Sequence, residues 1–247
     1  MITKFKLLFI LFVLGTMNSV FCQDKRPNIL FIVADDMGAW TLGSSKNENS
    51  FTPELDKLAD DGALFTNAFS NSAVCSPSRA ALISGRYPSE CNVLDVLYKE
   101  SINELDTSLI LWPEVLLESG YQTALVGKWH LGERPESFPE NRGFSKFSGF
   151  LHGGLLSKDP VVRIEGKDTI FTGKYTPDVL ADLTIGYIEE FANQPWVISL
   201  NFWAPHANTR FPKDFSPPYD DRSWLPMQDL DMDYWKNLKL TLPEPHF

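Results

Sequence analysis

The residue with the clearest chemical potential is Cys75, which opens the run Cys75-Ser76-Pro77-Ser78-Arg79. An apolar segment follows and Gly85 ends it, so we predict a helix here. Pro77 suits the first helical position, where no amide donor is missed. Cys75 then lies just before the helix, next to its free N–H groups and the positive end of its dipole. This setting favours a nucleophile on sulfur, or one derived from it, over the alternative of a buried structural cysteine.

Two adjacent carboxylates, Asp35 and Asp36, follow the apolar run from Ile29 to Ala34. A continuous apolar run of this length is typical of a strand buried on both faces of a parallel sheet. Open α/β sheets bind ligands at the carboxyl ends of their strands. Hard oxygen ligands suit Ca²⁺ or Mg²⁺. A solvated turn explains an Asp-Asp-Met-Gly sequence equally well, so both interpretations stay open on these residues alone.

Two further strand ends carry basic side chains. Lys128 and His130 follow a strand predicted at 121–126, in a turn bracketed by glycines. His206 follows a strand predicted at 196–203. An isolated lysine or histidine is usually a surface residue, but their shared position leads us to expect Lys128 and His130 in one cleft.

The elements that position these residues alternate between strands and helices, which predicts an α/β fold with a mostly parallel sheet and helices on both faces. Segment 133–175 is expected to form loops with short strands, and segment 211–247 to be extended and loop-like. Within 133–175, the runs Arg142-Gly143-Phe144 and Phe147 to Phe150 are expected to pack a loop against the core. One helix is predicted to begin at Thr52-Pro53 and to end at Gly62, and a strand is predicted at 63–69. Two more helices are predicted: one at 112–119 that Gly120 ends, and one that Thr176 caps and that reaches Phe191.

The first 22 residues have the pattern of a secretory signal. Lys4 and Lys6 precede an apolar run from Leu7 to Leu14, which is short of the roughly 20 apolar residues that a membrane span needs. Cleavage after Cys22 predicts a secreted or periplasmic protein without stable membrane insertion. A lipoprotein acylated at Cys22 is disfavoured because the bulky Phe21 precedes it.

Composition sets further limits. The 247 residues suffice for one sizeable α/β domain. Loss of residues 1–22 removes two lysines and no acid, so the net charge moves from −10 to −12. An acidic exported protein does not fit nucleic-acid binding, which needs basic patches. Only Cys75 and Cys91 then remain, and a single disulfide between them is the alternative to a reactive Cys75.

Taken together, these residues resemble the formylglycine-dependent sulfatases of the alkaline-phosphatase-like superfamily. Residues 23–247 would form the N-terminal part of the catalytic domain, apparently truncated, because sulfatases are usually much longer and take an Asp-Asn pair from their later half. The resemblance rests on four motifs in order: Asn28 to Asp36, Cys75 to Arg79 with Ser84-Gly85-Arg86, Gly127-Lys128-Trp129-His130, and Ala204-Pro205-His206.

The resemblance implies a role for each site residue. Cys75 would be oxidised by a formylglycine-generating maturation enzyme, and the hydrated aldehyde would attack sulfur. Asp35, Asp36 and Cys75 would hold Ca²⁺, with Mg²⁺ also possible, and Arg79 would hold the diol and the metal site. Lys128 and His206 would contact the sulfate group, and one or both would aid departure of the alcohol. His130 would form a hydrogen bond with the diol.

The implied activity is hydrolysis of sulfate esters of carbohydrates or aryl alcohols. Two alternatives stay open. The first is a phosphonate or phosphodiester hydrolase of the same superfamily, because its substrates present a tetrahedral anion similar to that of a sulfate ester. A truncated, inactive remnant would at most bind anions, because Asp35, Asp36 and Cys75 fall short of the roughly 6 to 8 oxygen ligands that calcium takes.

Overall fold

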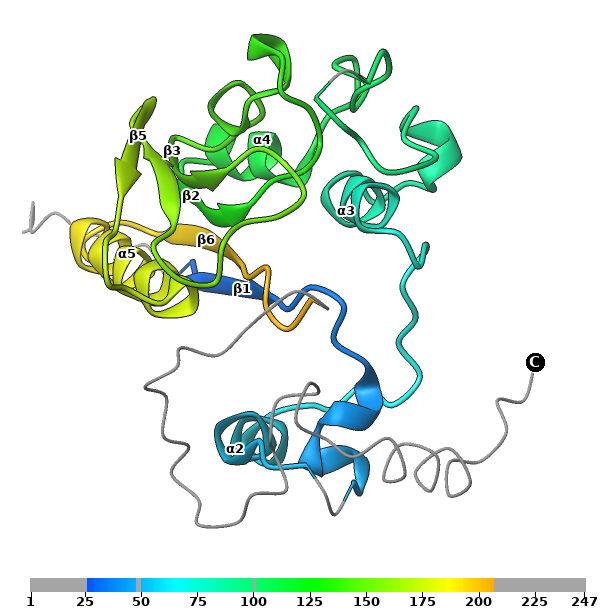
Figure 1. Cartoon of the computed structure of the whole chain (residues 1–247), viewed down its shortest axis with the longest axis vertical. Helices are drawn as coiled ribbons and strands as arrows, with labels where there is room; N and C mark the ends of the chain where they lie inside the picture. The colour runs from blue at the N-terminus through cyan, green and yellow to red at the C-terminus, as the bar shows by residue number, and fades with distance from the viewer. Residues whose placement is uncertain (1–25, 48–49, 100, 207–247) are drawn as a thin grey trace, which may run out of the picture.

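A six-stranded sheet forms the centre of the protein in a computed structural model that describes residues 26–47, 50–99 and 101–206. The strand order is β1-β6-β2-β3-β4-β5, in which the first four strands run parallel and the last two form an antiparallel hairpin (Figure 1). The predicted mostly parallel α/β fold is therefore confirmed. The strands are β1 (Ile29–Val33), β2 (Gln122–Lys128), β3 (Lys146–Phe150), β4 (Val161–Ile164), β5 (Lys167–Ile170) and β6 (Trp196–Asn201).

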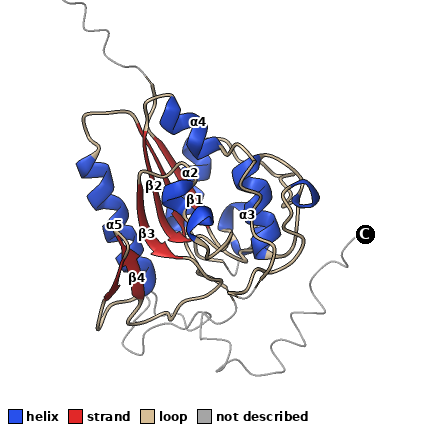
Figure 2. Ribbon diagram, turned by 90° about the horizontal axis from the view of Figure 1, so that it is seen from above, coloured by secondary structure: helices blue, strands red, loops and turns tan. Residues whose placement is uncertain are grey.

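Helices cover both faces of this sheet. Figure 2 shows α5 on one side of the strands and α3 and α4 on the other, as predicted. The α-helices are α2 (Pro53–Asp61), α3 (Cys75–Ser84), α4 (Trp112–Glu118) and α5 (Thr176–Glu190). Short 3-10 helices are η1 (Ala39–Thr41), η2 (Gly43–Ser45), η3 (Pro88–Glu90), η4 (Pro135–Ser137) and η5 (Pro139–Asn141).

Strand β2 explains why two layers of helices are needed. Its side chains alternate between the faces of the sheet. Leu125 joins the buried cluster under α3 and α4, whereas Ala124 and Val126 join the cluster under α5. All three residues are essentially inaccessible to water, so both faces of this central strand lie in the core.

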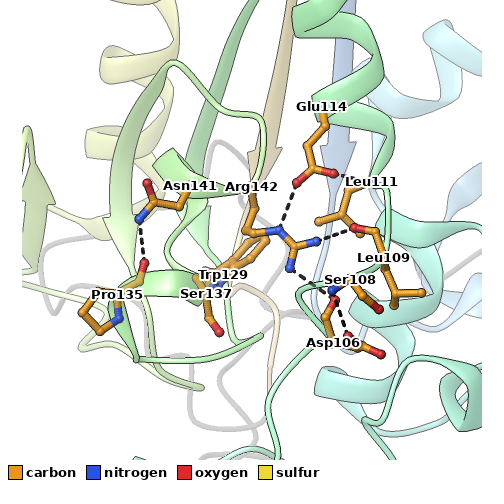
Figure 3. A network of polar contacts seen from close by, with 10 residues as sticks. All are labelled: Asp106, Ser108, Leu109, Leu111, Glu114, Trp129, Pro135, Ser137, Asn141 and Arg142. Carbon is orange, nitrogen blue, oxygen red and sulfur yellow. Dashed lines mark hydrogen bonds and ion pairs between the residues drawn. The ribbon is translucent and has the colours of Figure 1, made fainter.

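Arg142 is a buried cation that ties the loops above α4 together. Its Nε donates to Glu114 at 3.0 Å, and Nη1 and Nη2 donate to the carbonyls of Asp106 and Leu109 (Figure 3). The next residue, Gly143, has a φ of +88° and lies so close to α4 that a Cβ would come within 2.2 Å of the Glu114 nitrogen. The prediction that Arg142-Gly143-Phe144 packs against the core is confirmed, because Arg142 and Phe144 are both buried.

Several sequence predictions about strands are wrong. Strand β1 was predicted to be buried on both faces, but Leu30 is 42% and Ile32 52% exposed. The reason is that β1 pairs only with β6 within the described residues, and α5 packs on β2, β3 and β6 instead. Segment 63–69 forms no strand in the described structure, because it finds no sheet edge to pair with and its apolar residues lie exposed. Phe147 to Phe150 belongs to β3 rather than to a loop.

Element ends also differ from prediction. Helix α3 begins at Cys75, with Val74 as its N-cap residue, so Cys75 lies in the first turn and not before it. Helix α5 begins at Thr176 instead of being capped by it. Strand β2 continues through Lys128, because Gly127 lets its neighbours β3 and β6 approach closely. The signal at 1–22 and the extended segment 211–247 lie outside the described residues.

Cys75 and Cys91 are both free, so the predicted alternative of a disulfide between them is wrong. Cys75 starts α3, whereas Cys91 lies beside Ser84, the last residue of that helix, with Sγ 3.1 Å from its Oγ. The helix therefore separates the two thiols. Among the described residues, no helix has the length and apolarity required to cross a membrane.

A substitution of Gly143 tests the close packing of this glycine on α4. Gly143→Ala should lower the free energy of unfolding by roughly 2–4 kcal/mol, because the new methyl group meets backbone atoms that cannot move independently. The matched control is Gly173→Ala, since Gly173 has a φ of +77° and nothing within 4 Å of its Cβ position. Equal losses in urea denaturation for the two variants would contradict the packing argument.

Candidate active site

Three charged side chains from different elements meet at the carboxyl ends of the parallel strands. Asp35 follows β1, Lys128 ends β2 and Arg79 lies on α3. The Lys128 Nζ lies 2.6 Å from Asp35 Oδ2, and the Arg79 Nη2 lies 3.7 Å from Asp35 Oδ1. All three are buried, with Lys128 fully inaccessible. One carboxylate faces two cations, so the cluster carries a net charge of +1 and favours an anion beside it.

Burial and charge act in opposite directions on the two cations. Burial lowers the pKa of both Arg79 and Lys128, and Asp35 partly offsets that effect in each case. A negative charge at the Cys75 side chain acts in the same direction as Asp35 and raises the pKa of both groups. The structure therefore brings together four of the predicted site residues: Asp35, Cys75, Arg79 and Lys128.

Two nitrogens of the Arg79 guanidinium make no hydrogen bond within the described part of the chain. Its Nη1 donates to the Lys128 carbonyl at 2.9 Å. Its Nε and Nη2 are buried, and neither has a hydrogen-bond partner among the described residues. Buried guanidinium donors without acceptors are costly, so these atoms fit an oxygen-rich group bound next to the half-buried Cys75.

His130 is joined to the start of α3 through Leu97. The Leu97 amide donates to Ser76 Oγ at 3.1 Å, and the Leu97 carbonyl lies 2.9 Å from His130 Nε2. Because a carbonyl only accepts, Nε2 carries the proton and Nδ1 has a free lone pair. Nδ1 is buried and has no partner in the described structure. Burial, followed by the Lys128 charge, lowers the pKa of His130 to about 4, so the ring is neutral at pH 7.

The other two predicted site residues lie at the edge of this cluster. Asp36 is exposed and has a φ of +62°, which turns the chain sharply after Asp35. His206 is half-buried on the loop after β6, where its ring stacks on Trp203 with centroids 5.9 Å apart. This loop reaches the cluster, because the Asp35 amide donates to the Ala204 carbonyl at 3.2 Å.

Sequence reasoning missed Ser199 and Asn201, which support the cluster from β6. Ser199 Oγ donates to Asn201 Oδ1 at 2.9 Å, and Asn201 Nδ2 donates to the Lys128 carbonyl at 3.1 Å. The sequence contains a signal for them, because Ser199 and Asn201 are polar residues two positions apart in an apolar strand and therefore point to the same face of the sheet.

The donor set fits part of a metal site. Asp35 and Asp36 supply hard oxygen atoms at one strand end, which suit Ca²⁺ or Mg²⁺. Within the described ranges, however, no group of three or more His, Cys, Asp or Glu side chains is placed to hold a metal ion. The two aspartates would therefore supply at most two of the ligands that such an ion takes.

The fold and these residues define an α/β protein with a buried, positively charged site at the ends of its parallel strands. The sequence profile of the family described as Sulfatase matches residues 27–234. The chain belongs to the sulfatase family, and the predicted resemblance is confirmed.

Individual relatives and solved structures agree with this assignment. Human N-acetylgalactosamine-6-sulfatase is 39% identical over 137 residues, which cover 51% of this chain and 26% of that protein. The crystal structure of Ps i-CgsB in complex with k-i-k-neocarrahexaose has a TM-score of 0.72 and 29% identity, over 75% of this chain and 47% of the other. A structure solved with its substrate D-glucosamine-2-N,6-O-disulfate has a TM-score of 0.65 and 31% identity, over 74% of this chain and 35% of the other. The chain thus spans about a quarter of the first relative and less than half of these two structures.

The charge balance of the cluster predicts unequal effects of two substitutions. Asp35→Asn leaves both Lys128 and Arg79 buried without a carboxylate, so we expect a loss of about 3–5 kcal/mol in the free energy of unfolding. Lys128→Met leaves Asp35 paired with Arg79 and should cost less than half as much. Urea denaturation in the presence of a metal chelator measures both. A larger loss for Lys128→Met would show that the carboxylate does not hold the cluster together.

The neutral state of His130 predicts a pH dependence of stability. Its pKa in the folded protein is about 4, below the value near 6.5 in an unfolded chain. The unfolded state therefore binds more protons between these values, and stability falls as the pH drops from 6.5 to 4, by about 3 kcal/mol in all. His130→Asn should remove most of this slope, since asparagine tolerates the φ of +62°. His152→Asn, at an exposed histidine, is the control that should retain the slope.

Proposed function

We propose that the chain contributes the nucleophile and anion-binding part of a sulfatase that hydrolyses sulfate esters of carbohydrates or aryl alcohols. Membership of the sulfatase family supports the reaction class. The observation that carries the proposal is the buried cluster of net charge +1 beside Cys75, in which Nε and Nη2 of Arg79 make no hydrogen bond to the described residues. A sulfate group is a tetrahedral anion whose oxygen atoms can accept from such donors.

Cys75 is proposed as the site of the nucleophile. A maturation enzyme would oxidise it to formylglycine, whose hydrate supplies one hydroxyl for attack on sulfur and another for product release. Its place in the first turn of α3 puts free backbone N–H groups and the positive end of the helix near the reacting atoms.

The surrounding residues would bind the sulfate and move protons. Arg79 donates from Nε and Nη2, and Lys128 supplies a second fixed positive charge. His130 is neutral with a free lone pair on Nδ1, so it would accept a proton at that atom. His206 would contact the sulfate or the leaving alcohol from the loop after β6.

A divalent cation completes the proposal. Asp35 and Asp36 would be two of its ligands, and a bound Ca²⁺ or Mg²⁺ would neutralise sulfate oxygens and favour the deprotonated form of a hydroxyl near it. Calorimetric titration with calcium tests this part. Absence of binding would leave the chain as the inactive remnant, which at most binds anions.

Export is proposed from the signal at residues 1–22. Amino-terminal sequencing of protein recovered outside the cytoplasm should begin at Gln23. A mature chain that still begins at Met1 would contradict this part of the proposal.

Modification of Cys75 gives the sharpest test. In protein co-expressed with a maturation enzyme, mass spectrometry of the peptide that contains residue 75 should show an aldehyde in place of a thiol. Cys75→Ala should abolish release of nitrophenol from 4-nitrophenyl sulfate and leave the fold intact, because the side chain is only half-buried. The control is Cys91→Ala, which removes the other free thiol and should keep the activity. Undiminished turnover by Cys75→Ala would refute the assignment.

Comparison of esters separates the alternatives. Turnover of 4-nitrophenyl sulfate should exceed that of 4-nitrophenyl phosphate and of the matching phosphonate ester. The reverse order would identify a phosphonate or phosphodiester hydrolase.

A further inference from the structure

A pocket of about 810 Å³ lies beside the candidate site. Its wall includes Phe150 and Leu151, which follow from the end of β3, and Trp203 from the loop after β6. The Phe150 carbonyl accepts from the Trp129 amide and the Leu151 carbonyl from the His130 amide. The backbone that holds His130 is therefore also the wall of this pocket.

The β4–β5 hairpin supplies the polar side of the pocket. Val161 and Arg163 on β4 both line it, while Val162 between them is fully buried on the other face. Asp168 on β5 is the cross-strand neighbour of Arg163 and lines the pocket as well. Glu133 lies in the wall outside the hairpin, so the pocket has one guanidinium and two carboxylates.

An aromatic ring, and not an ion pair within the described residues, holds Arg163 in the pocket wall. Its guanidinium lies 4.8 Å from the centre of the Phe138 ring, which holds it by a cation–π contact. No ion pair joins Arg163 to a carboxylate within the described residues, although Asp168 is its strand neighbour. Its Nε is buried without a hydrogen-bond partner there. Because Arg163 lines the pocket, a guanidinium donor without a partner within the described residues points to an acceptor on a ligand.

The charges of the pocket decide what kind of acceptor fits. Two carboxylates and one guanidinium give the lining a net charge of −1, which disfavours a second anion. Carboxylates accept from hydroxyl groups, and a guanidinium donates to hydroxyl or amide oxygens. The exposed apolar side chains of Leu156 and Val161 in the lining suit the C–H groups of a ring. This combination matches an uncharged ring that bears several hydroxyl groups.

We propose that this pocket binds the uncharged part of a sulfated sugar and that Arg163 and Asp168 make it selective for a ligand without a second anionic group. The assignment of the sugar as substrate rests on the proposed function. The binding of an uncharged sugar to this pocket does not.

Binding to the full chain tests the proposal with three probes: N-acetylglucosamine, N-acetylglucosamine 6-sulfate and D-glucosamine-2-N,6-O-disulfate. Saturation-transfer NMR reports on the weak ligands and calorimetry on the tighter ones. The monosulfated sugar should bind at least tenfold more tightly than the disulfated one. Asp168→Asn should narrow this difference, because it removes a negative charge from the lining.

Substitutions at Arg163 test the residue directly. Arg163→Gln should weaken binding of both N-acetylglucosamine and its 6-sulfate by about tenfold, the loss expected for a hydrogen bond to a charged group. Arg163→Lys keeps the charge but loses Nε, and should also weaken binding. Lys167→Gln is the matched control, because it removes an exposed positive charge from the same hairpin outside the pocket lining, and it should change nothing.

The outcomes separate this proposal from the proposed function. Equal effects of Arg163→Gln and Lys167→Gln on N-acetylglucosamine binding, or tighter binding of the disulfated sugar, would overturn it. If the protein releases no sulfate but still binds N-acetylglucosamine in a manner that depends on Arg163, only the proposed function is overturned.

Discussion

The pairing of Asp35 with Lys128 and Arg79 is the interaction on which the site depends. A buried ammonium group at the end of β2 is costly without a carboxylate, and Asp35 meets that requirement at 2.6 Å. Because the three residues come from the end of β1, the end of β2 and helix α3, the cluster forms only when these elements are assembled. The Lys128 carbonyl adds a second constraint, since Arg79 and Asn201 both donate to it. A single residue thus joins the sheet, the helix that carries Cys75 and the neighbouring strand β6.

Glycines make this convergence possible in the middle of the sheet. A Cβ on Gly127 would lie 2.1 Å from the Asn201 carbonyl oxygen, and one on Gly149 would lie 2.0 Å from the Gly127 carbonyl oxygen. Three adjacent strands, β3, β2 and β6, therefore lie closer at this level than side chains would allow. Gly127 also has a φ of +102°, which few other residues adopt. The close approach leads directly into Lys128, so the backbone geometry and the charge cluster depend on each other.

Local patterns in the sequence predicted most elements that carry the site, because apolar runs and helix end signals act over a few residues. The positions of Asp35, Cys75 and Lys128 at element ends followed from the same patterns. What local patterns could not supply is the strand order, in which β6 lies between β1 and β2. For that reason both faces of β1 were expected to be buried and segment 63–69 was expected to form a strand. The pairing of Asp35 with Lys128 was not predicted either, because it joins the ends of two strands that are far apart in the sequence. The support from Ser199 and Asn201 depends on the same long-range order.

The cluster and the pocket beside His130 have opposite charge balances. The cluster has two cations and one carboxylate, whereas the pocket lining has one cation and two carboxylates. A ligand with a single anionic group can place that group at the cluster and its uncharged part in the pocket, and the reverse orientation is unfavourable at both ends. A ligand with a second anion would have to place it beside the carboxylates of Asp168 and Glu133. If the pocket binds a sulfated sugar as proposed, the two charge balances favour one orientation and a single anionic group.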